Sequence, residues 1–435
     1  MHMPSKIRIS ACALSLSLAL CCTASHAEDV FIVGIATHLM NYETSPAKAL
    51  QMVSDAGITA VKDDAYWSTA EWAANQLRIV APWRTFLNTT KDKKLTTLTI
   101  LDYSTQFHGN LKPRTPEVKT AYLKYVDYVT RQLPGKTDYW EIWNEWDLEG
   151  PKDPKLSADY ATLVKEAVPL IRKNDPKAKI LAGSVTPEGM NFGFADRLID
   201  AGILDHIDGL SVHPYVHCAG RGQNTPEAWA KWVRDYVRHV NEKAGKEIPI
   251  YLTEVSWPSH TGNCGNTPET VASYIARTFF LARTIPSLRG MWWYDLVNDG
   301  QDKTDQEHNF GLLYPNLDPK PGYDVLKAVS PFVRDYTYDP GPSTLANDVY
   351  LLYFNKGSEH VVVGWADGRS QDKQVVGNAQ LSGRLQLIDT AHPTKGQINT
   401  DTSWTCSAGQ CAATVTLTGF PKIISLNAPN EMVKR

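Results

Sequence analysis

Two glutamates in this chain each follow a short apolar run. Glu145 ends the segment 140–145, and Glu254 ends the run 248–254. Runs of this length and composition indicate buried strands. Two carboxyl groups at strand ends can cleave a glycosidic bond with retention of configuration, one as acid/base and the other as nucleophile. We therefore expect Glu145 to be the acid/base, which must carry a proton in the first step, and Glu254 to be the ionised nucleophile.

Polar and aromatic side chains lie at the ends of the other apolar runs as well. Asn144 would hold the sugar 2-hydroxyl, and Tyr215 would donate a hydrogen bond to Glu254. Neighbours on a regular strand point to opposite faces, so the strand must end or bulge before Asn144 and Glu145 for both to face one site. Flat aromatic faces can stack on sugar rings. The candidate substrate-binding residues are His38, Lys62, Trp67, Asn144, Trp146, His213, Tyr215, Trp257, Trp293 and Tyr294.

Other charged residues near these runs have a structural interpretation. Glu141 lies four positions before Glu145, and we expect it to pair inside the fold with a buried cation such as Lys62. Asp63 and Asp64 are expected to anchor the loop after the second strand through local hydrogen bonds.

Eight apolar runs alternate with amphipathic stretches over the first three quarters of the chain. They predict strands at 31–37, 58–63, 95–102, 138–144, 178–185, 208–214, 248–254 and 289–295. Helices are expected between them, with starts marked by Thr-Pro-Glu at positions 115, 225 and 267 and by Ser45-Pro46. Eight strand–helix units in about 300 residues are typical of a (β/α)8 TIM barrel of the α/β class.

The pattern changes after residue 335. Short strand-like runs at 350–354, 361–365, 385–388, 414–417 and 423–426 are separated by turn residues, which predicts a C-terminal antiparallel β-sandwich. The segment 339–342 is the expected boundary. The predicted domains are a signal peptide at 1–27, a catalytic barrel at 28–334 and a β-sandwich at 335–435.

The N-terminus has the pattern of a cleavable signal peptide. Lys6 and Arg8 precede an apolar stretch, and Ser25-His26-Ala27 fits the cleavage rule. The stretch is too short for a good membrane span, and no later segment is apolar for 18 residues. Lipidation of Cys21 or Cys22 is a weaker alternative. We expect a periplasmic or secreted protein, and a monomer.

The cysteines and the net charge indicate which bonds, cofactors and partners to expect. Beyond the predicted signal peptide lie Cys218, Cys264, Cys406 and Cys411; in an oxidising compartment an even count favours disulfides. We expect the pairs Cys406–Cys411 and Cys218–Cys264. The spacing does not resemble a zinc motif, and no metal or organic cofactor is expected because two carboxyls suffice for the reaction. The net charge of −3 argues against nucleic acid as a partner.

Taken together, these motifs resemble glycoside hydrolase family 39, in the clan of retaining enzymes with glutamates on barrel strands four and seven. The matching segments lie between about residues 30 and 330: Trp140-Glu-Ile-Trp-Asn-Glu145, His213-Pro-Tyr215, Thr253-Glu254-Val-Ser-Trp257, Trp293-Tyr294-Asp295, Glu307-His-Asn-Phe-Gly-Leu312 and Lys320-Pro321. The resemblance implies the roles already assigned to Glu145, Glu254, Asn144, His213 and Tyr215. One departure is Lys62, because the clan usually has Arg there, and Lys lacks the planar fork of donors.

The sequence thus predicts a glycosidase that hydrolyses O-glycosyl bonds (EC 3.2.1.-). The length, signal and single sandwich look most like bacterial hydrolases of biofilm exopolysaccharides within this family, so the favoured interpretation is endo-acting cleavage of a polysaccharide. The alternatives are an exo-acting β-xylosidase and, from another class, a non-catalytic carbohydrate-binding barrel. A retaining enzyme needs the two carboxyls about 5–5.5 Å apart.

Overall fold

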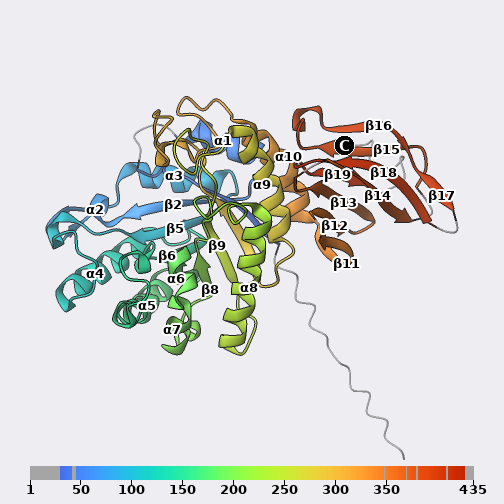
Figure 1. Ribbon diagram of the computed structural model, residues 1–435. Helices are drawn as coiled ribbons and strands as arrows, with labels where there is room; N and C mark the ends of the chain where they lie inside the picture. Colours follow the sequence, from blue (N-terminus) through green and yellow to red (C-terminus); the bar gives the residue numbers. More distant parts are fainter. Residues whose placement is uncertain are drawn as a thin grey trace, which may run out of the picture.

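The computed structural model describes residues 30–41, 46–346, 348–368, 370–378, 381–407 and 410–426. The predicted signal peptide lies outside these ranges, as does Ser45 of the first predicted helix start. Within them the chain folds into a barrel followed by a β-sandwich, coloured blue to yellow and orange to red in Figure 1.

Eight parallel strands close the barrel in the order β1-β10-β9-β8-β7-β6-β5-β2. Each of the eight predicted strands is present, which confirms the TIM barrel. The strands are β1 (Ile32–Ala36), β2 (Ala60–Tyr66), β5 (Thr96–Asp102), β6 (Tyr139–Ile142), β7 (Lys179–Val185), β8 (Gly209–Val212), β9 (Ile250–Val255) and β10 (Leu288–Trp293).

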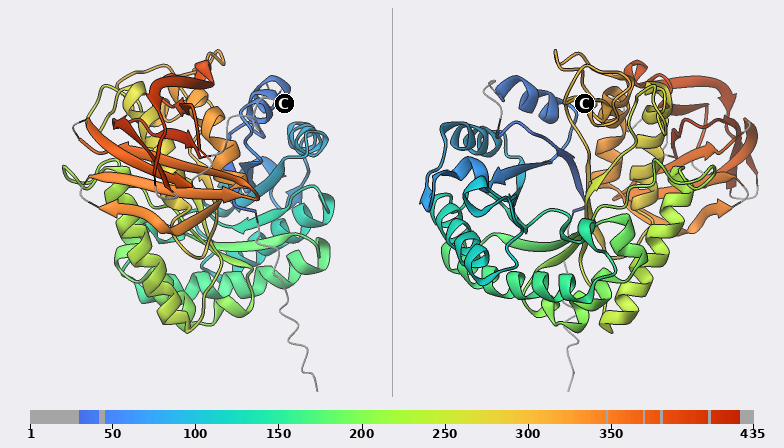
Figure 2. Two further views of the ribbon diagram at one scale, coloured as in Figure 1. Left: turned by 90° about the vertical axis from the view of Figure 1, so that its right-hand side faces the viewer. Right: turned by 60° about the vertical axis from the view of Figure 1, so that its left-hand side comes forward.

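The helices surround this barrel on the outside, as both views of Figure 2 show. They are α1 (Ala47–Asp55), α3 (Ala81–Asp92), α4 (Pro116–Gln132), α5 (Pro154–Asn174), α7 (Phe194–Asp200), α8 (Pro226–Ala244), α9 (Pro268–Ala282) and α10 (Pro321–Asp335). The predicted Thr-Pro-Glu starts are confirmed. The hydroxyls of Thr115, Thr225 and Thr267 each accept a hydrogen bond from the backbone N–H three residues later, which satisfies a donor that the helix leaves unpaired.

Short elements decorate the loops at the barrel ends. After β2 come α2 (Trp67–Ala70) and a hairpin of β3 (Glu71–Ala73) with β4 (Gln76–Leu77), and α6 (Pro187–Asn191) follows β7. The 3₁₀ turns are η1 (Gln106–His108), η2 (Trp146–Glu149), η3 (Ile203–Asp205), η4 (Glu307–Asn309) and η5 (Pro393–Lys395).

Apolar side chains fill the lower part of the barrel interior, so it is a packed core and not a pore. Its largest member is the indole of Trp292, which is fully buried. Gly34 on β1 faces this indole, and a Cβ there would lie 2.4 Å from a ring carbon. Only glycine therefore leaves room for the Trp292 side chain. The inner cluster consists of Ala60, Leu98, Ile100, Tyr139, Leu181, Tyr251 and Trp292.

The β-sandwich consists of a six-stranded antiparallel sheet and a three-stranded one, in the orders β11-β12-β13-β19-β15-β16 and β14-β18-β17. Its strands are β11 (Thr337–Ala346), β12 (Val349–Lys356), β13 (Glu359–Ala366), β14 (Gln371–Asn378), β15 (Arg384–Asp389), β16 (Gln397–Ser403), β17 (Thr405–Ser407), β18 (Gln410–Leu417) and β19 (Lys422–Ser425). The expected boundary at 339–342 is wrong, because these residues lie inside β11. An edge strand tolerates their prolines, and the register shifts between Asp339 and Thr344.

A buried charged network joins the sandwich to the barrel. Arg277 on α9 donates to Glu227 on α8 (Nε to Oε1, 2.7 Å) and to Asp367 of the sandwich (2.8 Å). The indole N–H of Trp365 also donates to Glu227, at 2.9 Å. Because Arg277 binds both carboxylates and Glu227 in turn accepts from Trp365, the contact specifies how β13 sits against the helices.

Both predicted disulfides are present. Cys218 and Cys264 join the loops after β8 and β9, with 5.0 Å between their Cα atoms, and Cys406 and Cys411 join β17 to β18. In the part of the chain that the structure describes, no helix has the length and apolar character that crossing a membrane requires.

Candidate active site

The backbone after β6 turns sharply, which places Asn144 and Glu145 together at one cavity. The strand ends at Ile142, and Trp143 and Glu145 then adopt positive φ angles of 63° and 46°. Positive φ is uncommon outside glycine and breaks the alternation of strand faces. The predicted end of the strand before Asn144 is therefore confirmed.

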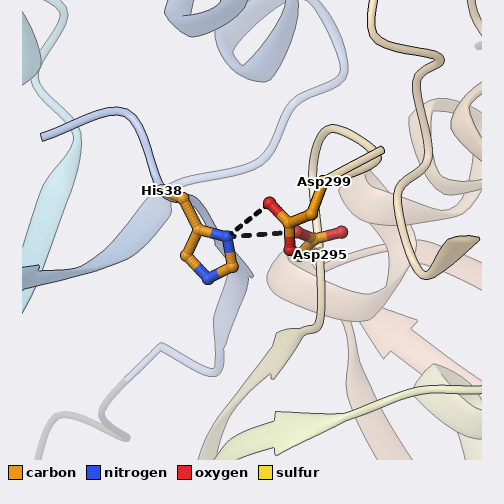
Figure 3. Close-up of side chains that lie close together, drawn as sticks. All are labelled: His38, Asp295 and Asp299. Carbon is orange, nitrogen blue, oxygen red and sulfur yellow. Dashed lines mark hydrogen bonds and ion pairs between the residues drawn. The ribbon is translucent and has the colours of Figure 1, made fainter. Parts of the chain in front are cut away.

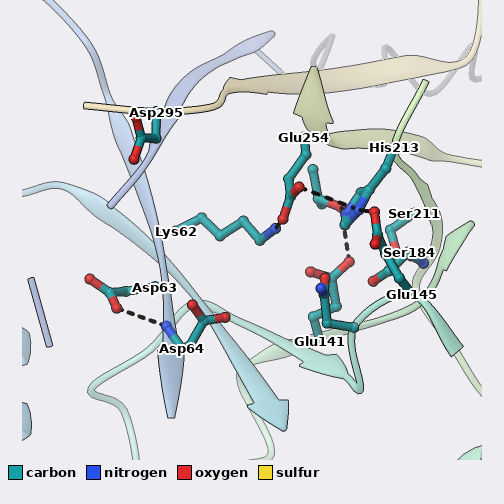
Figure 4. A network of polar contacts seen from close by, with 12 residues as sticks. Lys62, Asp63, Asp64, Glu141, Glu145, Ser184, Ser211, His213, Glu254 and Asp295 are labelled. Atoms are coloured by element: carbon teal, nitrogen blue, oxygen red, sulfur yellow. Dashed lines mark hydrogen bonds and ion pairs between the residues drawn. The ribbon is translucent and has the colours of Figure 1, made fainter. Parts of the chain in front are cut away.

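The carboxyl groups of Glu145 and Glu254 face each other beside His213 (Figure 4). One carboxylate oxygen from each glutamate and one nitrogen of His213 all lie within 4.8 Å of one another. These are individual oxygens, and whole carboxyl groups in retaining enzymes lie about 5–5.5 Å apart against about 6.5–9.5 Å in inverting ones. An oxygen–oxygen distance of at most 4.8 Å is compatible with the shorter of these two ranges.

Glu254 is held as a carboxylate by its neighbours. The ammonium of Lys62 contacts Oε1, the hydroxyl of Tyr215 donates to Oε2 at 2.8 Å, and Nδ1 of His213 lies 3.6 Å from Oε2. Burial raises the pKa of Glu254, but His213 and Lys62 together with these hydrogen bonds outweigh it and lower the pKa to about 2. The expected pairing of Glu141 with Lys62 is wrong, because the ammonium of Lys62 forms its ion pair with Glu254.

A chain of hydrogen bonds runs from the barrel interior to Glu145. The Thr253 hydroxyl donates to Oε1 of buried Glu141 across 3.0 Å, and Nε2 of His213 lies 3.0 Å from the same hydroxyl oxygen. A hydroxyl has one proton, so His213 must be the donor to Thr253. Nδ1 of a neutral His213 then presents a lone pair to Oε1 of Glu145, 2.9 Å away. His213 and Glu145 can therefore share one proton between them.

The protonation of His213 is favoured by the carboxylates around it. Burial lowers the pKa of this imidazole, but Glu254 and Glu145 raise it by more, so that the net shift is upward. The proton shared with Glu145 is thereby held next to the place where a leaving group would need it.

The cavity above these residues has a volume of about 530 Å³. Asn144 is oriented in it by a hydrogen bond from its amide nitrogen to the Tyr103 hydroxyl (2.6 Å). The predicted site residues that line it are His38, Asn144, Glu145, Tyr215, Glu254 and Tyr294. The predicted substrate-binding set does not contain the other lining residues, which are Asp64, Tyr66, Tyr103, Leu148, His217, Gln306, Glu307 and Phe310. Of these, Tyr103 directly follows β5 and so belongs to the strand-end residues from which that set was chosen.

The four tryptophans predicted to bind substrate do not reach the cavity. Trp67, Trp146, Trp257 and Trp293 have exposed fractions of 0%, so the interpretation as sugar platforms is wrong. The indole N–H groups of Trp146 and Trp257 donate to the backbone carbonyls of Leu156 and Asn224. Tryptophans at strand ends can pack sideways under the loops, and the sequence gives no sign of which face they take.

His38 forms one wall of the cavity and is held by two aspartates (Figure 3). Its Nδ1 lies 2.8 Å from Oδ1 of Asp299 and 3.8 Å from Oδ2 of Asp295. Burial lowers the pKa of His38, but these acids raise it to about 10. The three groups could also receive a metal ion, yet Nδ1 is already engaged by Asp299. His38 is thus a fixed cation beside the cavity.

Asp63 and Asp64 differ in what they contact. Asp63 accepts hydrogen bonds from the Thr37 hydroxyl (2.6 Å) and the Met40 backbone (3.0 Å), which confirms its expected role as a loop anchor. The Asp64 backbone joins this anchor, but its carboxylate lines the cavity. Buried Asp102 lies nearby, and neither of its carboxylate oxygens has a hydrogen-bond partner among the described residues. Burial and the Asp64 charge raise the pKa of Asp102 well above its usual range.

The barrel with a polar cavity at the strand ends, followed by a β-sandwich, is an architecture shared with solved glycoside hydrolases. No family model and no curated protein matches the sequence. Among solved structures, the chain is similar to a family 39 glycoside hydrolase from the gut symbiont Bacteroides cellulosilyticus, at a TM-score of 0.74 and 23% identity, over 92% of this chain and 82% of that one.

Two further structures have lower scores but equal coverage of this chain. A monomeric β-xylosidase from Caulobacter crescentus aligns with a TM-score of 0.60 and 14% identity, and a family 30 subfamily 8 xylanase from Clostridium acetobutylicum with 0.59 and 13%; each alignment covers 92% of this chain and 96% of the other. At these identities the comparisons show the fold. They confirm the predicted architecture, and solved family 39 enzymes are among the structures that share it.

Proposed function

We propose that this protein is a retaining glycoside hydrolase of family 39 that cleaves a polysaccharide by double displacement. The observation that carries the proposal is the pair of facing glutamates, of which Glu254 is held ionised and Glu145 can share a proton with His213. One fixed nucleophile and one group that can gain and lose a proton are the two chemical parts that this reaction requires.

In the first step, a carboxylate oxygen of Glu254 attacks the anomeric carbon of the sugar. The bond from that carbon to the leaving oxygen breaks, and Glu145 gives its proton to that oxygen. Tyr215 fixes the nucleophile through its hydrogen bond to Oε2. The amide of Asn144, oriented by Tyr103, holds the sugar 2-hydroxyl as positive charge develops on the ring. The product is a glycosyl ester of Glu254.

In the second step, Glu145 works in the opposite direction. As a carboxylate it takes a proton from a water molecule, which attacks the anomeric carbon and releases Glu254. The hydrogen bonds through His213 and Thr253 to Glu141 orient the imidazole in both steps, so Glu145 meets the same partner whether it gives or takes the proton. Glu141 and Thr253 act here as positioning residues.

Several features support a polymeric substrate outside the cytoplasm. The chain contains two disulfides, and disulfides form and persist in oxidising compartments outside the cytoplasm. The sequence pattern before residue 28 also favours export. A second cavity of about 730 Å³ adjoins the catalytic one, sharing Tyr215 and His217. A cleft that continues beyond the catalytic cavity gives room for further sugar units on one side of the bond being broken, as a polymeric substrate requires.

The second candidate is an exo-acting β-xylosidase. The similar Caulobacter crescentus structure is a β-xylosidase, and the catalytic cavity itself is compact. This alternative predicts release of single sugars from chain ends.

Product sizing separates these functions. Wild type and Glu254→Gln are incubated with plant and bacterial polysaccharides, β-1,4-xylan and β-1,4-mannan included, and the products are resolved by mass. Mid-sized oligosaccharides from wild type alone are the expected result. Monosaccharides alone would favour the exo-acting enzyme. Absence of products, with retained binding of a polymer, would contradict the hydrolase and favour a carbohydrate-binding barrel.

A further inference from the structure

The second cavity lies on the opposite side of the catalytic glutamates from most of the site. Its walls are α6, the loop after β8 and the first half of α8. In the closed barrel, β7 and β8 lie between β6, which positions Glu145, and β9, which carries Glu254. The catalytic cavity extends instead toward the ends of β1, β2, β5 and β10, where His38, Asp64, Tyr103 and Tyr294 lie. A glycan that spans both cavities would extend past the two glutamates, which line the catalytic cavity.

The side that holds the sugar under attack can be assigned from the contacts. Asn144, Tyr103 and Tyr294 surround the catalytic cavity, which thus supplies the contacts to the ring attacked by Glu254. The part of the glycan that departs with the proton from Glu145 then extends into the second cavity. This assignment rests on the function proposed above.

Trp232 gives the second cavity a surface suited to sugar. Among the residues that line the two cavities it is the one tryptophan, and it is half-buried. Its indole N–H donates to Oδ1 of Asn191 on α6 at 3.1 Å, which fixes the ring plane. A fixed aromatic face can stack on the apolar face of a pyranose. Exposed Glu188, Gln223 and Lys231 surround it with groups that hydrogen-bond to hydroxyls.

The junction of the two cavities is formed by His217 and is held in place by the disulfide next to it. His217 lines both, and its Nδ1 is buried with no hydrogen-bond partner in the described part of the chain. The next residue, Cys218, lines the second cavity and is bonded to Cys264 in the loop that follows Glu254. The disulfide therefore holds this wall at a set distance from Glu254, and it places the His217 ring where the two cavities meet.

We propose that the second cavity is a leaving-group subsite that binds the departing end of a polysaccharide, with a pyranose ring stacked on Trp232 and a hydroxyl bonded to His217. Its ligand is a segment of at least two linked neutral sugars. Such a subsite also binds acceptor sugars in reverse, because an acceptor that replaces water in the second step attacks the glycosyl ester of Glu254 through its own hydroxyl and gives its proton to Glu145.

Transfer to an acceptor tests the subsite without knowledge of the natural polymer. Wild type and Trp232→Ala are given 4-nitrophenyl β-xyloside, β-glucoside and β-mannoside with xylobiose, cellobiose or mannobiose as acceptor. The ratio of transfer product to hydrolysis product is measured by mass. Because the ratio compares two fates of one intermediate, a change in folded fraction cancels. Trp72→Ala, which removes an exposed tryptophan outside both cavities, is the matched control.

The expected result is a transfer ratio about tenfold lower in Trp232→Ala than in wild type and Trp72→Ala, for at least one disaccharide, since an aromatic contact contributes up to about 1.5 kcal/mol. An unchanged ratio in Trp232→Ala, or an equal fall in Trp72→Ala, would overturn the subsite.

Failure of the proposed function gives a different result, because wild type would then release nitrophenol from no glycoside and also no product from any polysaccharide in the product sizing described above. Calorimetric binding of the three disaccharides to Glu254→Gln still tests the cavity in that case. Binding that weakens about tenfold when Trp232→Ala is added supports the assignment, and absence of binding to Glu254→Gln overturns it.

Discussion

The two sides of the catalytic cavity hold their glutamates differently. At the end of β9, the Glu254 side chain is 12% exposed and contacts an ammonium, a phenol and an imidazole. At the end of β6, the Glu145 side chain is 22% exposed, and the hydrogen bonds of the described residues give it one partner, His213.

This difference supports the roles proposed for the two glutamates. A carboxylate surrounded by donors and a cation keeps its charge and position, as a nucleophile must. A carboxyl group with a single partner, which can either accept or donate its proton, is free to change protonation twice in each cycle. The following predictions test this asymmetry in order of expected size.

Removing each carboxylate gives the largest effects and separates the two roles. Glu254→Gln should lower kcat/KM on the order of 10⁵-fold for every substrate, since no other group can form the glycosyl ester. Glu145→Gln should cost about 10²–10⁴-fold with a poor leaving group but little in the first step with 2,4-dinitrophenolate, which leaves without a proton. Initial rates on aryl glycosides of graded leaving ability measure both. The reverse pattern, with Glu145→Gln insensitive to the leaving group, would exchange the assignments.

Removing the positive charge of Lys62 beside Glu254 should have the next largest effect. Glu254 is ionised above its lowered pKa of about 2 and loses its charge as the pH falls through that value. Lys62→Met removes an attraction that favours the charge, so the acid limb of the kcat/KM profile should move to higher pH, with activity at neutral pH reduced about 100-fold. Lys62→Arg keeps the charge and is the matched control, with its acid limb near that of wild type. Identical acid limbs for wild type and Lys62→Met would show that Lys62 does not set the charge of Glu254.

Breaking the hydrogen-bond chain behind Glu145 should reduce activity less, and it should move the alkaline limb of the kcat/KM profile. Glu141 accepts a hydrogen bond from Thr253, and Thr253 accepts one from His213. We expect this chain to favour the extra proton that His213 shares with Glu145. A raised pKa means that the proton is present at low pH and is lost as the pH rises, so Glu141→Gln and Thr253→Val should move the alkaline limb to lower pH, with rates about tenfold lower. Thr253→Ser keeps the hydroxyl and should restore the wild-type profile. A uniform loss at all pH values would indicate a merely structural role.

The buried tryptophans should affect stability and leave kinetics nearly unchanged. Trp257→Phe keeps an aromatic ring but removes the bond to Asn224 and leaves a cavity, at a cost of about 1–3 kcal/mol in the free energy of unfolding. Urea unfolding measures this cost, and KM for an aryl glycoside should stay within about twofold, as expected for a side chain away from substrate. A rise of KM without loss of stability would restore the platform interpretation.

The sequence allowed prediction of the features that depend on strand order and strand ends. The apolar runs located all eight barrel strands, and the polar residues at their ends brought Glu145, Tyr215 and Glu254 into one cavity, with Lys62 and His213 in contact with the glutamates. In a parallel barrel every strand ends at the same rim, so this inference needs no knowledge of packing.

The features that it missed depend on side-chain direction and on long loops. Trp257 follows β9 and Trp293 ends β10, close in sequence to the positions of site residues such as Tyr294, but both indoles are buried in the core. His217 and Gln306 reach the cavity from loops whose course no local pattern specifies. The predicted partner of Lys62 was also wrong. Glu141 and Glu254 both face the barrel interior, and only the distance of each carboxylate from the Lys62 ammonium decides which of them forms the ion pair.

The most direct test of the central assignment is to trap the covalent intermediate. Wild type is incubated with 2-deoxy-2-fluoro-β-glycosyl fluorides, in which fluorine at C2 slows both steps while fluoride leaves readily, and digested peptides are then sequenced by mass spectrometry. The account predicts one added glycosyl group, located on Glu254. A label on Glu145, or an inverted product anomer with no label on any peptide, would contradict it.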